Sequence, residues 1–339
     1  AWRRPMEVGI YIRDYLEDPT RPMFEQIEEA AEVCRQAKAL GFSAIYMPQH
    51  FLAHPTIWMQ PMQMLARLAP EAEGLRLITG ILLLTYHNPV DIADQVATLD
   101  HISNGRFTLG VGLGYREKEL AAFGTNRRDR VSRMEESIDL MKQLWTGDEI
   151  TFEGKHWQVH EAKCSVTPVQ KPHPPIWMAA QSRNAVRRAA RLCEAVVIGP
   201  QPTWEDFRYL AKEYNDALAE YGKTTQKMLA ANRSITIARD RETAITEAKA
   251  KGEAKATMYA GFNMQETNTV DLGLAGQRDI ADWAVAGSPQ DCAETITRAV
   301  EEDGLDYIGL ASLNLPHDFS AKLEYLQLIS EELLPLLPA

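Results

Sequence analysis

Two histidines directly follow apolar runs, where a side chain could carry out acid–base chemistry. His50 lies in YMPQHF and His87 lies in TYHNP. Histidine has an ordinary pKa close to neutrality, so it can take up and return a proton under mild conditions. We therefore expect His50 to be the main catalytic acid–base residue and His87 to be the second candidate.

The remaining six of the eight histidines are expected to be structural. They are His54, His101, His156, His160, His173 and His317. His156 and His160 are four residues apart, but they flank a strand-like segment without a carboxylate of fixed geometry. We therefore expect no metal site.

A second kind of chemistry is indicated by the segment AQSR, residues 180–183. It lies between an apolar run and a helical segment, and Ser182 is a suitable N-cap. The free amides and the dipole at a helix N-terminus attract an anion, and Arg183 could add charge-assisted hydrogen bonds. The segment predicts a phosphate-binding turn made by Ala180, Gln181, Ser182 and Arg183.

Three glycines follow the apolar run in GRFTLGVGLGYREKELAAFG, residues 105–124. Their spacing at Gly110, Gly112 and Gly114 lacks the third glycine of the dinucleotide-binding pattern GxGxxG, which usually opens the first unit of its domain. Here the glycines follow the fourth apolar run. They predict a tight turn after a strand, where a flat ring or a phosphate can approach the backbone.

The elements that position these residues repeat along the chain. Eight apolar runs, each followed by a helical segment, cover residues 6–12, 42–48, 75–84, 106–112, 174–180, 194–200, 229–239 and 305–313. This alternation predicts an α/β fold with parallel strands, a (β/α)8 TIM-type barrel. The longer gaps, about 115–173 and 240–304, predict insertions after strands four and seven. No linker divides the chain, so residues 1–339 are expected to form a single domain.

Composition restricts the class of protein. Hydrophobic residues make up 45%, charged residues 24%, and the formal net charge is −11. An acidic chain is not typical of nucleic-acid binders, and we expect a small-molecule substrate and neither a nucleic-acid nor a membrane partner. The four cysteines, Cys34, Cys164, Cys193 and Cys292, are far apart and suggest a reducing compartment, so a cytoplasmic location is expected.

The segment SNGRFTLGVGLGYREKELAAFG, residues 103–124, resembles the signature of the bacterial luciferase-like monooxygenases. Residues 88–106, 144–159, 168–192 and 286–310 resemble further parts of that family. The resemblance spans nearly the whole chain. It implies a TIM-type barrel that binds FMN, or in sister groups the deazaflavin F420, at the carboxyl ends of the strands.

The resemblance also assigns candidate cofactor residues. Around the flavin ring it places Met47, Thr79, Gly80, Gly112, Leu113 and Gly114, and around the phosphate Ala180, Gln181, Ser182 and Arg183. Luciferase has an arginine for the phosphate at the position of Leu113. Tyr115, Arg116 or Arg183 is the expected substitute here.

Gln49 departs from luciferase at a catalytic position. Luciferase has two adjacent histidines in this segment, and this chain has Gln49 at the first position and His50 at the second. Glutamine cannot act as a base, which argues against light emission and luciferase-like aldehyde chemistry. Gln49 is nevertheless retained as a candidate catalytic residue.

The functional hypothesis is a two-component monooxygenase. Reduced FMN, supplied by a separate reductase, would react with O2 to form a C4a-peroxyflavin, which oxygenates a small apolar, carbonyl-containing substrate by hydroxylation or Baeyer–Villiger oxidation. An F420-dependent reductase or dehydrogenase and a non-catalytic flavin-binding protein remain open alternatives. A homodimer is expected by resemblance.

Large apolar side chains near the strand ends are expected to line the substrate pocket. The candidates are Trp58, Met59, Met62, Trp177, Met178 and Phe262. The insertion at about 240–304 is the candidate lid, in particular residues 255–285, which contain Gly261, Gly273 and Gly276.

Overall fold

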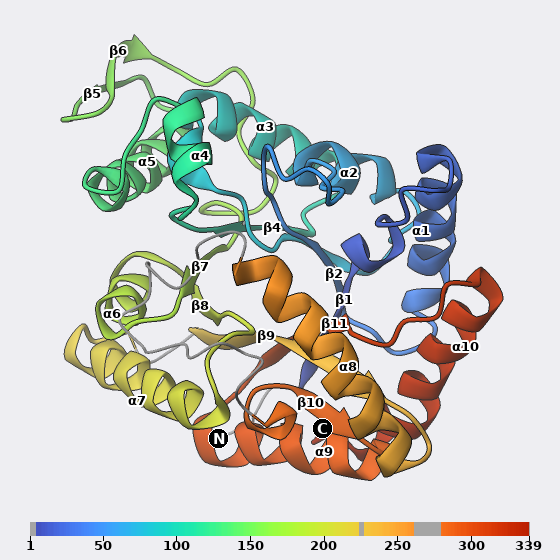
Figure 1. Cartoon of the computed structure of the whole chain (residues 1–339). Helices are drawn as coiled ribbons and strands as arrows, with labels where there is room; N and C mark the ends of the chain where they lie inside the picture. The colour runs from blue at the N-terminus through green and yellow to red at the C-terminus, as the bar shows by residue number, and fades with distance from the viewer. Residues whose placement is uncertain (1–4, 224–226, 261–278, 339) are drawn as a thin grey trace.

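Eight parallel strands close a barrel, and helices cover its outside (Figure 1). The computed structural model describes residues 5–223, 227–260 and 279–338. The barrel strands are β1 (Glu7–Tyr11), β2 (Ala44–Met47), β3 (Arg76–Thr79), β4 (Phe107–Val111), β7 (Ile176–Ala180), β8 (Ala195–Ile198), β9 (Met228–Ile237) and β11 (Tyr307–Ser312). Their order is β1-β2-β3-β4-β7-β8-β9-β11, and β11 pairs back with β1. Each strand overlaps one predicted run, so the (β/α)8 prediction is confirmed.

Helices follow the barrel strands, and several of them begin at a residue whose side chain caps the first turn. They are α1 (Met23–Ala37), α2 (Pro61–Leu68), α3 (Pro89–Ile102), α4 (Glu117–Ala122), α5 (Arg130–Leu144), α6 (Arg183–Leu192), α7 (Trp204–Glu220), α8 (Arg241–Ala260), α9 (Pro289–Arg298) and α10 (Phe319–Leu328). Asn88 accepts the Val90 N–H just before α3. Thr203 with Asp206 forms a capping box at α7, which satisfies two otherwise unpaired backbone amides.

Alternating side chains of each strand divide the core into two layers. Inside the barrel, Trp177 meets Tyr307 with ring centroids 5.0 Å apart, and Met228 and Ala230 belong to the same buried cluster. Between the barrel and the helices, a second buried cluster contains the intervening residues of the strands, such as Met178. The period of two in a strand therefore assigns each residue to the barrel interior or to the helix layer.

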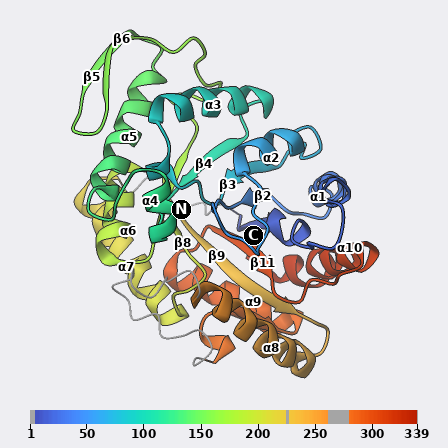
Figure 2. The same cartoon turned by 45° about the horizontal axis from the view of Figure 1, so that its top comes forward.

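The two predicted insertions contain three strands in addition to the eight predicted barrel strands. After β4 the chain forms α4, α5 and a two-stranded hairpin, β5 (Ile150–Glu153) and β6 (Gln158–Ala162), which lies outside the barrel beside α5 (Figure 2). After β9 come α8 and the short strand β10 (Val285–Gly287), which pairs with the end of β9. Most of the candidate lid, including Gly261, Gly273 and Gly276, lies outside the described residues.

Strand β3 ends earlier than the predicted run 75–84. It stops at Thr79, the Gly80–Ile81 peptide bond is cis, and Leu82 then pairs with Val111 at the end of β4. Close packing at this point requires Gly110, because a side chain there would collide with the carbonyl oxygen of Thr79. The segment after β3 therefore lies against β4 at the barrel mouth.

Within the described part of the chain, every helix is too short or too polar to span a lipid bilayer.

Candidate active site

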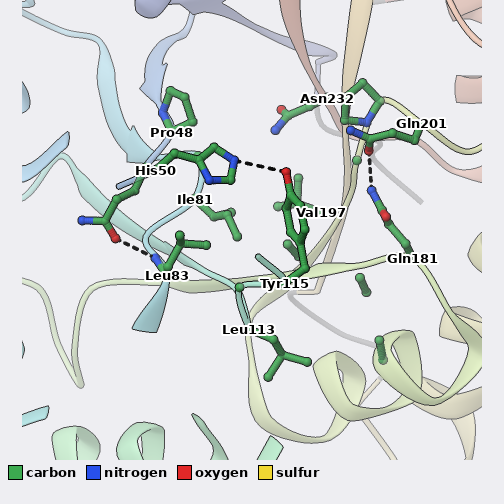
Figure 3. Close-up of a pocket in the computed structure, with 18 of the residues that line it drawn as sticks. Pro48, His50, Ile81, Leu83, Leu113, Tyr115, Gln181, Val197, Gln201 and Asn232 are labelled. Atoms are coloured by element: carbon green, nitrogen blue, oxygen red, sulfur yellow. Dashed lines mark hydrogen bonds between the residues drawn. The ribbon is translucent and has the colours of Figure 1, made fainter. Parts of the chain in front are cut away.

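A cavity of about 410 Å³ opens at the carboxyl ends of the barrel strands (Figure 3). In a parallel barrel all of these ends meet at one mouth, so loops from distant parts of the sequence line a common space. The volume falls within the range of roughly 300–1,000 Å³ that is usual for small-molecule sites. It is the candidate active site.

His50 borders this cavity, three residues after β2 ends. Its Nδ1 lies 2.9 Å from Oε1 of Glu119, and its Nε2 lies 3.5 Å from the hydroxyl of Tyr115 (Figure 3). The ring also meets Trp58 edge-on, with centroids 4.5 Å apart. Only 8% of His50 is exposed, so these contacts fix the orientation of the ring.

Glu119 on α4 holds His50, and sequence analysis missed this residue. Its side chain is fully buried, and Oε1 also accepts the Phe51 N–H at 2.8 Å and Nη1 of Arg116 at 3.0 Å. Burial raises the pKa of Glu119, but the hydrogen bond and charge of His50, the Phe51 amide and Arg116 outweigh this effect and hold the pKa below its usual range. Glu119 is therefore a carboxylate at neutral pH.

This carboxylate determines the tautomer of His50. A carboxylate only accepts hydrogen bonds, so Nδ1 of His50 must carry the proton in the bond to Glu119. When the ring is neutral, the lone pair of Nε2 is directed toward the Tyr115 hydroxyl and the cavity. The imidazole can then accept a proton from a bound molecule.

The signal that could have identified Glu119 is its spacing from Arg116. The two residues are three apart on a helix that directly follows the glycine turn, so they share a helix face. In the sequence REKEL they are indistinguishable from the exposed charges around them. Only the packing of α4 against the segment after β2 shows that they are buried.

Gln49 and His87 form a second polar network. Oε1 of Gln49 accepts the Leu83 N–H at 2.9 Å and lies 3.0 Å from Nε2 of His87, while its Nε2 donates to Gln60 at 2.8 Å. Because Oε1 is an acceptor, His87 must donate from Nε2, and burial lowers the pKa of His87. Gln49 lines the cavity, but His87 does not. The structure therefore places His87 behind Gln49, as a neutral residue that orients its amide.

Seven of the residues expected around the flavin line the cavity. They are Gly80, Leu113, Gly114, Tyr115, Ala180, Gln181 and Ser182. Pro48 and Ile81 line it as well. These residues follow β2, β3, β4 and β7, so the structure brings together the ends of four neighbouring strands.

Met47 and Thr79 do not line the cavity. Met47 is 1% exposed and belongs to the cluster between barrel and helices. Thr79 is fully buried, and its hydroxyl donates to the Gly110 carbonyl oxygen at 2.8 Å. Each is the last residue of its strand and so lies near the barrel mouth, as expected. Its side chain, however, packs inside the protein and does not face the cavity.

Three other expected cofactor residues also lie outside the cavity lining. A side chain at Gly112 would collide with Ile81, so this glycine serves the packing of neighbouring loops. Arg183 extends into solvent and its Nε donates to Glu213 at 2.9 Å. Arg116 is bound to Glu119 and to the Phe51 carbonyl oxygen. Both arginines are therefore engaged by other residues outside the cavity lining.

Two arginines that sequence analysis missed lie at the α6 end of the cavity. The lining residues from α5, α6 and the residue before α6 are Arg130, Val131, Ser182, Asn184, Ala185 and Arg188. Nη1 of Arg130 donates to the Gly114 carbonyl oxygen at 2.8 Å, and Nε of Arg188 donates to Glu135 at 2.9 Å. Ser182 precedes α6 without capping it through its side chain. No aspartate or glutamate is among the described lining residues, so this end favours an anion.

The expected substrate-pocket residues are dispersed. Trp58 lines the cavity, whereas Met59 lies in a separate groove between α1 and α2. Trp177 is buried inside the barrel against Tyr307, and Met178 points from the same strand into the helix layer, as expected for adjacent strand residues. Met62 also belongs to the helix layer, and Phe262 lies outside the described residues.

The deep, barrel side of the cavity was not predicted from the sequence. It is formed by Tyr11, Tyr46, Val197, Asn232 and Ala311. These residues come from β1, β2, β8, β9 and β11, and most belong to the cluster inside the barrel. The alternation of β-strand side chains was the available signal, but it does not reveal which alternate set faces inward.

No group of three or more metal-binding side chains is present among residues 5–223, 227–252 and 279–338, whose side chains the structure describes.

Comparison with known proteins defines the class of this chain. Residues 6–307 match the family described as luciferase-like monooxygenase. The chain belongs to this family, as its resemblance to the family predicted. The closed barrel and the cavity at its mouth agree with this membership.

Curated relatives of the chain have more than one activity. The oxygenase component of flavin-dependent trigonelline monooxygenase from Acinetobacter baylyi is 33% identical over 160 residues, 47% of this chain and 44% of that protein. An F420-dependent glucose-6-phosphate dehydrogenase from Microbacterium testaceum is 26% identical over 88% of this chain and 90% of that protein. For several relatives, the matched stretch covers about half of their length.

Solved structures share the fold at low sequence identity. The monooxygenase RslO1 from Streptomyces bottropensis has a TM-score of 0.84 at 23% identity, over 97% of this chain and 99% of that one. The oxygenating constituent of 3,6-diketocamphane monooxygenase from Pseudomonas putida, in complex with FMN, has a TM-score of 0.80 at 19% identity, over 98% and 99%.

Proposed function

We propose that the chain is the oxygenase component of a two-component flavin-dependent monooxygenase. It would use reduced FMN and O2 to oxygenate a small, apolar, carbonyl-containing compound. The observation that carries this proposal is His50, which is held by a buried carboxylate so that Nε2 faces the cavity of a luciferase-like barrel.

The residues of the cavity fit FMN. A phosphate at the start of α6 would meet free amides of the first helical turn and the charges of Arg130 and Arg188. A flat ring would lie against the segment Gly80–Ile81, with Leu113 and Gly114 from the neighbouring loop. We therefore assign the phosphate to Arg130 and Arg188 rather than to Arg183 or Arg116.

Reduced flavin, when bound, supplies the electrons and the activation of O2 that an oxygenation requires. The chain would supply a base, because Nε2 of His50 can accept a proton from a molecule bound in the cavity and return it in a later step. Apolar walls made by Ile81, Leu83, Leu113 and Val197 exclude water from the centre of the cavity. Gln49, held by Leu83 and His87, presents a fixed amide beside His50.

A separate reductase would supply the reduced flavin. One relative is named as the oxygenase component of a flavin-dependent monooxygenase, which implies a second component. We propose that this chain likewise acts with a separate flavin reductase.

The second candidate function is an F420-dependent reductase or dehydrogenase. It is favoured by the F420-dependent glucose-6-phosphate dehydrogenase, whose match covers 88% of this chain. The same basic end of the cavity would accept the phosphate of either cofactor.

An anaerobic titration separates the two functions. We expect reduced FMN to bind saturably, with reduced F420 binding at least tenfold more weakly, as measured by quenching of the intrinsic tryptophan fluorescence. Tighter binding of F420 than of reduced FMN would contradict the monooxygenase and favour hydride transfer.

A further inference from the structure

Asn232 lies on the inward face of β9, at the deep side of the cavity. Met228 and Ala230, four and two residues earlier on the strand, belong to the cluster inside the barrel, so Asn232 continues the same face. It stands opposite Gly309 of β11 in the strand register. A side chain at Gly309 would collide with Oδ1 of Asn232, so the glycine provides the space that the amide occupies.

The side-chain amide of Asn232 has no hydrogen-bond partner among the residues that the structure describes. It is half-buried and lines the cavity (Figure 3). The hydrogen bond recorded at this residue uses its backbone carbonyl oxygen, which accepts from Arg233. An amide that is withdrawn from bulk water and left unpaired loses hydrogen bonds on folding. A bound molecule that restores them gains affinity at this position.

The surroundings of this amide are aromatic and apolar. Tyr11 and Tyr46 lie beside each other with ring centroids 5.0 Å apart, and Val197 and Ala311 complete the wall. A neutral ring compound would pack against these side chains, with a single polar atom directed at the amide.

Arg233, the next residue, also lines the cavity, but part of its guanidinium is engaged with neighbouring residues. The guanidinium of Arg233 lies 4.4 Å from the ring centroid of Trp204 on α7, and its Nη1 donates to the Gly199 carbonyl oxygen at 2.6 Å. Arg233 alternates with Asn232 and so belongs to the outer face of β9. Its Nε and Nη2 have no partner among the described residues, which makes a carboxylate the rival ligand.

The position of Asn232 opposes the expected place of the flavin ring. In the strand order, β9 and β3 are separated by three strands in both directions around the barrel. Asn232 therefore lies across the barrel from the segment Gly80–Ile81 that follows β3. A ring that rests on this segment has its other face toward Asn232, and the substrate would lie between them.

We propose that Asn232 determines substrate specificity by donating a hydrogen bond to the carbonyl oxygen of a neutral ring compound. This inference rests on the proposed function for the position of the flavin. It adds the substrate class, a cyclic or aromatic ketone or aldehyde, and the residue that recognises it.

The test compares three probes with reduced FMN bound, under anaerobic conditions, by isothermal titration calorimetry. Acetophenone has the carbonyl group, ethylbenzene lacks it, and benzoate carries the rival carboxylate. We expect wild-type protein to bind acetophenone about tenfold more tightly than either of the others, the ratio that one neutral hydrogen bond supplies.

Two variants connect this difference to the amide. Asn232→Leu has a similar shape without hydrogen-bonding groups, and should make acetophenone and ethylbenzene equal. Asn232→Asp replaces the hydrogen-bond donor by an acceptor at neutral pH, and should also weaken the binding of acetophenone. Asn215→Leu, at an exposed position on α7, is the control and should leave the difference unchanged. A thermal melt of each variant verifies that it is folded.

Failure of this inference is distinct from failure of the proposed function. If reduced FMN does not bind to wild-type protein, the proposed function is wrong, whatever Asn232 does. If reduced FMN binds, three results overturn the inference: no acetophenone binding, equal binding of acetophenone and ethylbenzene, or tighter binding of benzoate. Asn232→Leu could also weaken the binding of FMN as much as the binding of acetophenone. This result would overturn the inference as well, because the amide would then bind the flavin and not the substrate.

Discussion

A buried carboxylate decides which nitrogen of His50 faces the ligand. Glu119 accepts hydrogen bonds from His50, the Phe51 amide and Arg116, and the arginine balances its charge. The three donors hold the carboxylate in place against Nδ1, and Nε2 of His50 is directed toward Tyr115 and the cavity.

Replacing Glu119 by Gln tests this role. An amide can also donate, so the Nδ1–H tautomer of His50 is no longer enforced. We expect 15N NMR of labelled protein to show one dominant His50 tautomer in wild type and a mixture in the variant. Glu117→Gln removes a charge from the exposed side of the same helix and should leave the tautomer unchanged. If Glu119→Gln shows the same His50 tautomer as wild type, Glu119 does not determine that tautomer.

The same variant has a consequence for stability. The folded-state pKa of Glu119 lies below its usual value of about 4.3. Its contribution to stability is therefore present above about pH 4.3 and lost as the pH falls through the folded-state pKa. We expect Glu119→Gln to lower the free energy of unfolding by about 1–3 kcal/mol at pH 7. In urea unfolding the difference from wild type should shrink toward pH 3.

At the scale of elements, the start of α6 and the start of α5 together make the anion end of the cavity. Sequence analysis predicted the first part, because Ser182 precedes a helix after a strand. It missed Arg130, which lies about fifty positions earlier in the sequence. Arg130 comes close to α6 only because α5 packs beside it in the folded chain. Arg183 was the nearer arginine in the sequence, but its side chain pairs with Glu213.

Arg130→Met and Arg183→Met form a matched pair of variants. We expect Arg130→Met to weaken FMN binding about tenfold or more, the cost of removing a hydrogen bond to a charged group, while riboflavin, which lacks the phosphate, is unaffected. Arg183→Met should change the affinity for neither FMN nor riboflavin. Fluorescence titration under anaerobic conditions with the reduced forms measures both. Equal losses for FMN and riboflavin would show that Arg130 acts on the ring or on the fold.

At the scale of the whole molecule, the order and number of barrel strands could be predicted because apolar runs and helical segments alternate. The inward or outward direction of single side chains could not, since a shift of one residue exchanges the two faces. Trp177 and Met178 were both expected in the pocket and lie in different layers of the core. Strand β10 has only three residues, too few to carry a pattern.

The closed barrel also explains why the site collects residues from so many elements. His50 follows β2, Glu119 belongs to the helix after β4, the anion end is at α6, and Asn232 is on β9. These residues are far apart in the sequence, and they come close together because the sheet closes into a barrel. The proposed sites for the substrate, the flavin and the base therefore come together only in the folded chain.

The central claim is that the protein activates O2 with reduced FMN, and stopped-flow absorbance tests it most directly. The complex with reduced FMN is mixed with oxygenated buffer, and the same is done with free reduced FMN. If the protein activates O2 in this way, its complex shows a transient spectrum that is neither that of reduced nor that of oxidised FMN and that persists after free reduced FMN has fully reacted. Direct conversion to oxidised FMN at the rate of the free cofactor would contradict it.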